Sequence, residues 1–199
     1  MTLTATGHPP ARTGQDRRGA GYLAVTLLPR PGGKPATTVP DRPDQDPATF
    51  FHRQLSQIAP VPLQDELARR IAALDGVRVA HSAISVPGAR GFFLSPRAGR
   101  GPAAAFMAGR EFAHLHPAQD GSMHAALPRR MRAAALARGW AEAHPLVGTP
   151  MVFGPRDAAE LEVVWQIFLA SYRFAAGLDG DLATGLDGDP AAGQAGGPP

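Results

Sequence analysis

Residues 110–127 read REFAHLHPAQDGSMHAAL, and this stretch decides the fold that we expect. Apolar and polar residues alternate on both sides of the segment PAQDG at 117–121, as they do in strands with one buried face. The Asp-Gly pair that closes the segment is typical of a β-hairpin turn. We therefore predict two antiparallel strands, 110–116 and 122–127, joined by a five-residue loop.

The predicted hairpin sorts its side chains onto two faces. A five-residue loop places His114 opposite His124. It likewise places His116 opposite Ser122, so these four polar residues share one face. The other face is apolar, which supports the register because a slip of one residue would mix the two faces. On that apolar face we expect Glu111, Ala113, Leu115, Met123, Ala125 and Leu127.

Three imidazoles on one face of a hairpin suit two kinds of chemistry. His114, His116 and His124 could bind a zinc or iron ion through neutral ring nitrogens and leave a coordination position open. Alternatively, they are acids and bases around a small substrate, since histidine titrates near neutral pH. His144, which follows another predicted strand, could join either group. The third interpretation is that these histidines only line a polar surface of the sheet.

Other elements of the fold follow from periodicity and turn residues. Helical spacing of apolar residues occurs at 48–58, 63–74, 129–138 and 158–175. Pro128 suits the first turn of the third helix, and Asp157 with Glu160 predicts a capping box for the fourth. Further strands are expected at 77–86, 91–94, 140–144 and 151–153. This order predicts an α+β fold, with a mainly antiparallel sheet around the histidine-bearing hairpin and about three to four helices against it.

Glycine and proline define the expected domain boundaries. The chain of 199 residues has 23 Gly and 21 Pro, and more than half of them lie in residues 1–47 and 178–199. Because both residue types oppose regular structure, we expect disordered termini. The first segment is rich in Pro, Gly and Arg and holds a candidate short strand at 21–28. Residues 48–177 form the predicted single domain, and 178–199 form an acidic Gly/Asp/Pro tail.

Composition excludes several classes of site and partner. The chain has no cysteine, so disulfides, thiolate metal sites and cysteine nucleophiles are excluded. No alternation of aromatic and basic residues indicates stacking on bases, so no nucleic-acid partner is expected. The start lacks a secretory leader, and the apolar stretch 161–176 is short and carries charges. We therefore expect no membrane partner and a cytoplasmic location.

Four motifs in a fixed order resemble a known family. They are EFAHLHP at 111–117, DGSMH at 120–124, GWAEAHPL at 139–146 and MVFGPRD at 151–157. In this order they resemble the fungal-type luciferase domain, which also has bacterial members. The resemblance is strong over 105–175, weaker over 50–100, and does not reach either end of the chain.

The resemblance implies oxygen chemistry. The fungal enzymes oxidise a hydroxylated pyrone, 3-hydroxyhispidin, with O2, emit light and need no known added organic cofactor. Carried over, His114, His116, His124 and His144 would be the catalytic pocket residues, one of them deprotonating an enolic hydroxyl. The chain lacks the N-terminal membrane segment of the fungal enzymes, so the resemblance predicts the shared fold rather than light emission.

We thus expect a protein that binds a small aromatic or enolic ligand in a histidine-lined pocket and oxygenates it with O2. No organic cofactor is expected, and a metal ion on His114, His116 and His124 is the alternative. Other functions left open are a non-catalytic ligand-binding or protein-interaction domain and a metal-dependent hydrolase; the oligomeric state is also open. The expected substrate-binding residues are Ser122, Trp140, Glu142 and Arg156.

Overall fold

A computed structural model of the chain describes residues 27–40, 46 and 50–178. Most of the two termini predicted to be disordered lies outside the described residues, as do residues 21–26 of the candidate strand at 21–28. The described part of the N-terminal segment packs against the fold without forming a strand. Leu27 is buried, and the backbone N–H of Arg30 donates to the carbonyl of Arg138 at 2.8 Å.

Six antiparallel strands form one sheet in the order β1-β2-β3-β4-β6-β5, which confirms the predicted α+β class. Within β3 and β4, His114 pairs with His124, Ala113 with Ala125, and Leu115 with Met123. The predicted hairpin register is therefore confirmed. The strands are β1 Val77–His81, β2 Arg90–Leu94, β3 Glu111–Leu115, β4 Met123–Ala125, β5 Ala141–Glu142 and β6 Met151–Val152.

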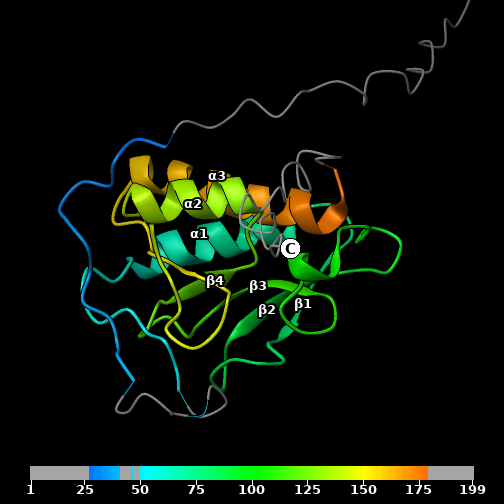
Figure 1. Ribbon diagram of the computed structural model, residues 1–199, viewed down its shortest axis with the longest axis horizontal. Coiled ribbons are helices and arrows are strands. Elements are labelled where there is room, and N and C mark those ends of the chain that lie inside the picture. The colour runs from blue at the N-terminus through cyan, green and yellow to red at the C-terminus, as the bar shows by residue number, and fades with distance from the viewer. Residues whose placement is uncertain (1–26, 41–45, 47–49, 179–199) are drawn as a thin grey trace, which may run out of the picture.

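Three α-helices lie together on one side of the sheet (Figure 1). They are α1 Val61–Ala72, α2 Arg129–Ala137 and α3 Ala158–Ala176, and a short 3-10 helix, η1, spans Ala103–Ala105. The Asp157 side chain caps α3 by accepting from the Glu160 N–H, while Glu160 accepts from the Arg156 N–H rather than from Asp157 itself. Gly177 ends α3 in the left-handed conformation, at φ 69°, which glycine adopts without strain.

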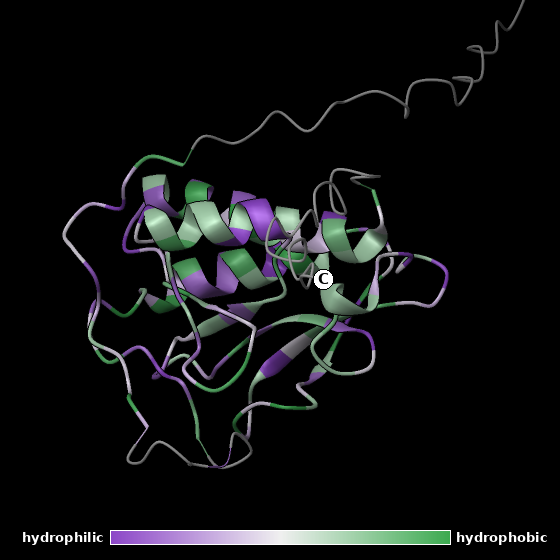
Figure 2. Cartoon of the chain, viewed as in Figure 1, coloured by the Kyte–Doolittle hydropathy of each residue, from purple (hydrophilic) through white to green (hydrophobic). Residues whose placement is uncertain are grey.

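The apolar face of the hairpin lies under these helices. Leu115 and Met123 of the hairpin belong to the buried core, together with Phe168 of α3 and Leu67 of α1. Figure 2 shows that α1 and α2 each carry both hydrophobic and hydrophilic residues, as helices packed on one side do. Among the described residues, none of the helices has the length and apolar character needed to cross a membrane. Because the helices cover the apolar face of the hairpin, the face that carries the histidines lies outside the hydrophobic core.

The helical spacing at 48–58 gave a wrong expectation. The described residues from 50 to 58 are not helical, and Gln54 instead forms a bridge with Thr37. The buried Gln54 explains the difference, because its backbone N–H donates to Ser122 Oγ at 2.8 Å and its side-chain oxygen accepts from the Gly154 N–H at 3.1 Å. These long-range bonds outweigh a weak helical preference. The segment therefore crosses the histidine face as an extended strap.

We expect Asp157→Ala to lower the free energy of unfolding by about 1 kcal/mol, because an N-terminal N–H of α3 loses its acceptor. Urea unfolding followed by circular dichroism measures the change. Asp65→Ala is the matched control, since Asp65 makes only an exposed ion pair with Arg90 at 3.2 Å and its loss should cost less than about 0.5 kcal/mol. Equal destabilisation by the two substitutions would contradict the capping role.

Candidate functional site

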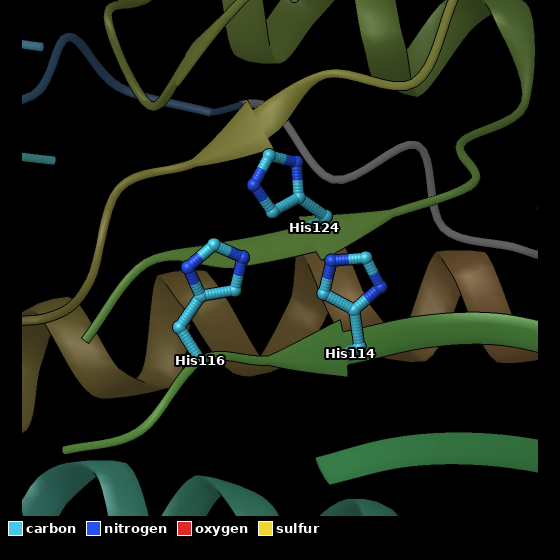
Figure 3. Close-up of side chains that lie close together, drawn as sticks. All are labelled: His114, His116 and His124. Atoms are coloured by element: carbon cyan, nitrogen blue, oxygen red, sulfur yellow. The ribbon is translucent and has the colours of Figure 1, made fainter. Parts of the chain in front are cut away.

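Three buried imidazoles meet on the face of the hairpin that points away from the helices. We call His114, His116 and His124 the histidine triad. Figure 3 shows the three rings gathered around one space. Ring centroids lie 4.9 Å apart for His114 and His124, 5.2 Å for His116 and His124, and 5.6 Å for His114 and His116. The period of the strand accounts for this grouping, because His114 and His116 are two residues apart and His124 faces them from β4.

Glu111 holds the first ring of the histidine triad. Its Oε1 lies 3.0 Å from His114 Nδ1, and Ser82 Oγ donates to the same oxygen at 2.7 Å. The sequence placed Glu111 on the apolar face, and that expectation was wrong. A register shift between Phe92 and Phe93 adds one residue to β3 between Ala113 and Glu111, so simple alternation fails at Glu111. Since a carboxylate only accepts, His114 donates from Nδ1 and keeps a lone pair on Nε2.

Asp120 holds the second ring in the same way. Its Oδ2 lies 2.8 Å from His116 Nδ1, which leaves the His116 Nε2 lone pair available. Ser122 fixes the carboxylate, since its hydroxyl and its backbone N–H both donate to Asp120 Oδ1. The turn that closes the hairpin therefore supplies the group that orients its second histidine.

His124, the third ring, contacts the extended strap. Its Nε2 lies 3.2 Å from the carbonyl oxygen of His52, which can only accept a hydrogen bond. The His52 ring is buried beside His144, with ring centroids 4.9 Å apart, and its Nε2 lies 3.5 Å from Glu142 Oε1. His144 Nδ1 accepts from the N–H groups of Leu146 and Val147, which places the proton of its neutral ring on Nε2. Five histidines from four segments thus converge here.

A cavity of about 620 Å³ opens over these rings. A volume of this size accommodates a small aromatic molecule. Its walls combine the five imidazoles with apolar side chains of the strap and of the loops after β1, before β3 and after β5. The lining residues are Phe50, Phe51, His52, Ala83, Ile84, Ser85, Met107, His114, His116, His124, His144, Val147 and Thr149.

Burial favours the neutral form of four of these imidazoles, those of His52, His114, His124 and His144. It lowers the pKa of His114 and of His52, in spite of the opposing carboxylates of Glu111 and Glu142. Burial and the neighbouring imidazoles hold the pKa of His124 well below its usual range. Burial, followed by the charge of His52, lowers the pKa of His144 to about 4. A neutral imidazole offers one lone pair, so the cavity presents several bases or ligand atoms together.

The anchoring carboxyls are ionised. Burial acts to raise the pKa of Glu111, but hydrogen bonds from His114, Ala83 and Ser82 outweigh it and lower the pKa. In Asp120 burial is likewise outweighed, here by hydrogen bonds from His116 and Ser122, so its pKa is lowered too. Two negative charges therefore lie directly behind the rings of His114 and His116.

The predicted site residues are divided between the cavity and its surroundings. His114, His116, His124 and His144 all line the cavity. Ser122 lies behind it, where it holds Asp120 and accepts from Gln54. Glu142 also lies behind the cavity wall and contacts His52.

Trp140 and Arg156, predicted to bind substrate, lie elsewhere. The indole of Trp140 belongs to the core, and its N–H donates to the carbonyl of Leu28 at 2.7 Å. Arg156 donates to the carbonyl of Pro31 at 2.7 Å and pairs with Glu160 at the start of α3. Both residues fasten the N-terminal segment to the fold, because their polar groups meet its carbonyls.

Sequence reasoning missed three residues of the site. His52 lay in a stretch assigned to a helix, 62 positions before His114, and no local pattern linked the two. Glu111 was excluded by strict alternation, although its spacing of three from His114 is close. Asp120 was read only as a turn residue. Its position four residues after His116 was the available signal, because such a turn folds the carboxylate back toward the ring.

Comparisons with known proteins match the part of the chain that carries the triad. Residues 109–171 match the family model described as "Luciferase domain". The luciferase of Armillaria ostoyae is 35% identical over 71 residues, which cover 31% of this chain and 27% of the relative. Those of Armillaria gallica and Armillaria mellea are 34% identical over 71 residues with the same coverage. No solved structure matches. The chain matches only 27% of the length of these curated relatives.

The buried neutral imidazoles should make the fold sensitive to acid. The pKa of His144 is about 4 in the folded chain, against 6.5 for an ordinary imidazole, so between these values the unfolded chain binds more protons. The free energy of unfolding should therefore fall as the pH drops from 6.5 toward 4. His52, His114 and His124 act in the same direction. Urea unfolding at several pH values measures the slope.

In His144→Gln we expect a shallower dependence of the free energy of unfolding on pH. The change in slope should correspond to up to about one proton fewer taken up per chain on unfolding. His81→Gln, which removes an exposed imidazole from β1, controls for the loss of a histidine. A slope in His144→Gln equal to that of the wild type would contradict the prediction.

Proposed function

We propose that this chain, whose residues 109–171 match the Luciferase domain family model, binds a small aromatic or enolic molecule and oxygenates it with O2. The observation that carries the proposal is the cavity of about 620 Å³ whose floor is the histidine triad. The family supplies the reaction class, and the side chains around the cavity supply the groups that such a reaction needs.

The walls of the cavity suit a flat, partly polar ligand. Phe50 and Phe51 of the strap and Val147 of the loop after β5 offer apolar surface for a ring. The imidazoles offer neutral acceptors for hydroxyl groups on the same ring. A charged ligand is disfavoured, since burial lowers the pKa of His114, His124 and His144 and so opposes their cationic forms. These features favour an enol or phenol over a carboxylate or phosphate.

The proposed reaction begins with loss of the enolic proton. His116 is the proton acceptor that the geometry favours, because Asp120 at 2.8 Å from Nδ1 stabilises the imidazolium formed when Nε2 takes the proton. The enolate carbon then donates its electron pair to O2, and one C–O bond forms. The resulting peroxide anion recovers the proton from His116 and gives an organic hydroperoxide. The substrate supplies both electrons, so no other reductant takes part.

Apolar side chains that partly cover the cavity would also protect such an intermediate. Water can reprotonate the enolate and hydrolyse reactive peroxides, so exclusion of water favours the reaction with O2. The strap and the loops after β1 and β5 cover the triad, which is at most 5% exposed. The proposal therefore assigns chemistry to the hairpin and shielding to segments far from it in sequence.

The test is O2 consumption by the full chain with hydroxylated pyrones, beginning with 3-hydroxyhispidin. We expect saturable O2 uptake by the wild type. His116→Ala and Asp120→Asn should each reduce it by about 100-fold or more, because the general base or its orienting partner is lost. An oxygen electrode and detection of hydroperoxide by mass spectrometry give two readouts.

His81→Ala, at an exposed position of β1, is the matched control and should retain full uptake. The absence of O2 uptake by the wild type together with the absence of pyrone binding in calorimetry would overturn the proposal. Uptake that persists unchanged in both site variants would overturn the assignment of the base.

A further inference from the structure

We propose that the histidine triad binds one divalent transition-metal ion, with Glu111 and Asp120 as the carboxylates that orient its ligands. This inference rests on the proposed function for the use of the site; it keeps the enol and O2 of that function and replaces His116, as the group that ionises the enol, with a metal ion. One nitrogen from each of His114, His116 and His124 lies within 4.8 Å of a nitrogen from each of the other two. All three residues are buried, so the donor atoms are already desolvated.

Small ring movements would complete the coordination geometry. Tetrahedral bonds of about 2.0–2.1 Å place imidazole nitrogens about 3.3 Å apart. The triad nitrogens would therefore need to approach one another by about 1.5 Å at most. Figure 3 shows the rings already grouped around one space.

The hydrogen bonds behind the rings are those of a metal site. Histidine ligands commonly donate their second ring N–H to a carboxylate or a carbonyl, which fixes the tautomer and raises the basicity of the ligating nitrogen. His114 donates to Glu111 at 3.0 Å, and His116 donates to Asp120 at 2.8 Å. A single catalytic base would need only one histidine oriented by a carboxylate. Here two neighbouring histidines, His114 and His116, each donate to a carboxylate of their own, and this second oriented ring favours a metal ion over a single base.

Charge balance favours a dication at this place. Burial lowers the pKa of His114 and His124, and the two carboxylates behind the triad are anionic and largely removed from water. An ion of charge +2 would offset these two charges across the rings. Lys34, the one lysine of the chain, pairs with Glu142 at 2.7 Å, and Glu142 contacts His52. The lysine therefore offsets the charge of Glu142 rather than that of Glu111 or Asp120.

The donor set restricts the metal. Imidazole suits Zn²⁺, Fe²⁺, Co²⁺, Ni²⁺ and Cu²⁺, whereas Mg²⁺ and Ca²⁺ prefer oxygen ligands. Three protein ligands below an open cavity leave positions for a substrate oxygen, as in catalytic rather than structural sites. A bound ion lowers the pKa of a coordinated hydroxyl. The triad would then ionise the enol as metal ligands, and His116 would not be the proton acceptor.

The test is metal binding by the full chain after any polyhistidine tag is cleaved. We expect one Co²⁺ per chain by elemental analysis after dialysis, with visible absorption bands typical of nitrogen-coordinated cobalt. His114→Ala and His124→Ala should abolish both signals. Glu111→Gln and Asp120→Asn keep all three ligands and should weaken affinity by about 10- to 100-fold. His81→Ala, which removes an exposed histidine, should bind cobalt as the wild type does.

Circular dichroism separates lost ligands from lost folding, and Glu111→Gln keeps the test decisive if an alanine variant does not fold. The inference would be overturned if the wild type bound Co²⁺, Zn²⁺ and Fe²⁺ each at less than one ion per chain. It would also be overturned if His114→Ala and His124→Ala bound metal as well as the wild type does. Metal binding without O2 uptake on pyrones would support the inference and contradict the proposed function. Undiminished O2 uptake by chelator-treated, metal-free protein would support the proposed function and contradict a role of the metal ion in it.

Discussion

The pairing register of β3 with β4 is the constraint on which the rest of the structure depends. In this register Leu115 faces Met123 on the side covered by helices, and His114 faces His124 on the other side. A shift of one residue would bury imidazoles against α3 and expose the apolar residues, so core formation itself selects the register. Folding of the hydrophobic core and assembly of the site are consequently one event. The polar face needs no separate stabilisation to be placed correctly.

Desolvation governs the chemistry on the polar face. Burial lowers the pKa of most imidazoles there, while hydrogen bonds keep the pKa of Glu111 and Asp120 low enough for ionisation. His114 and His116 each donate to a carboxylate, whereas His124 Nε2 faces the carbonyl of His52, and these partners fix where the protons are. For His114 and His116 the arrangement directs the Nε2 lone pairs into the cavity. In the proposed metal site a proton and a metal ion would compete for the same atoms, and the pH would decide between them.

Much of the fold and part of the site could be predicted from local sequence. The hairpin, α3 with its Asp157 cap, and the grouping of His114, His116 and His124 all follow from short-range periodicity and turn residues. Other features depend on distant partners. Glu111 reaches His114 only because a bulge opposite Phe92 and Phe93 breaks the alternation. The stretch around Gln54 has helical spacing, but bonds to Ser122 and Gly154 hold it extended. The bonds of Gln54 have no local signature, since their partners lie 68 and 100 positions away in the chain.

The cavity depends on residues outside the range that matches the Luciferase domain. That range, 109–171, contains the triad and His144 but not the strap that carries Phe50, Phe51 and His52. Long-range hydrogen bonds fasten the strap and the segment before it, including those from Gln54 to Ser122 and from Thr37 to Glu142 at 3.0 Å. The matched range supplies the histidine triad and His144, whereas the strap supplies apolar walls. Because the proposed ligand would meet both, relatives that share the triad and differ in this strap would retain the proposed chemistry and differ in the molecule they accept.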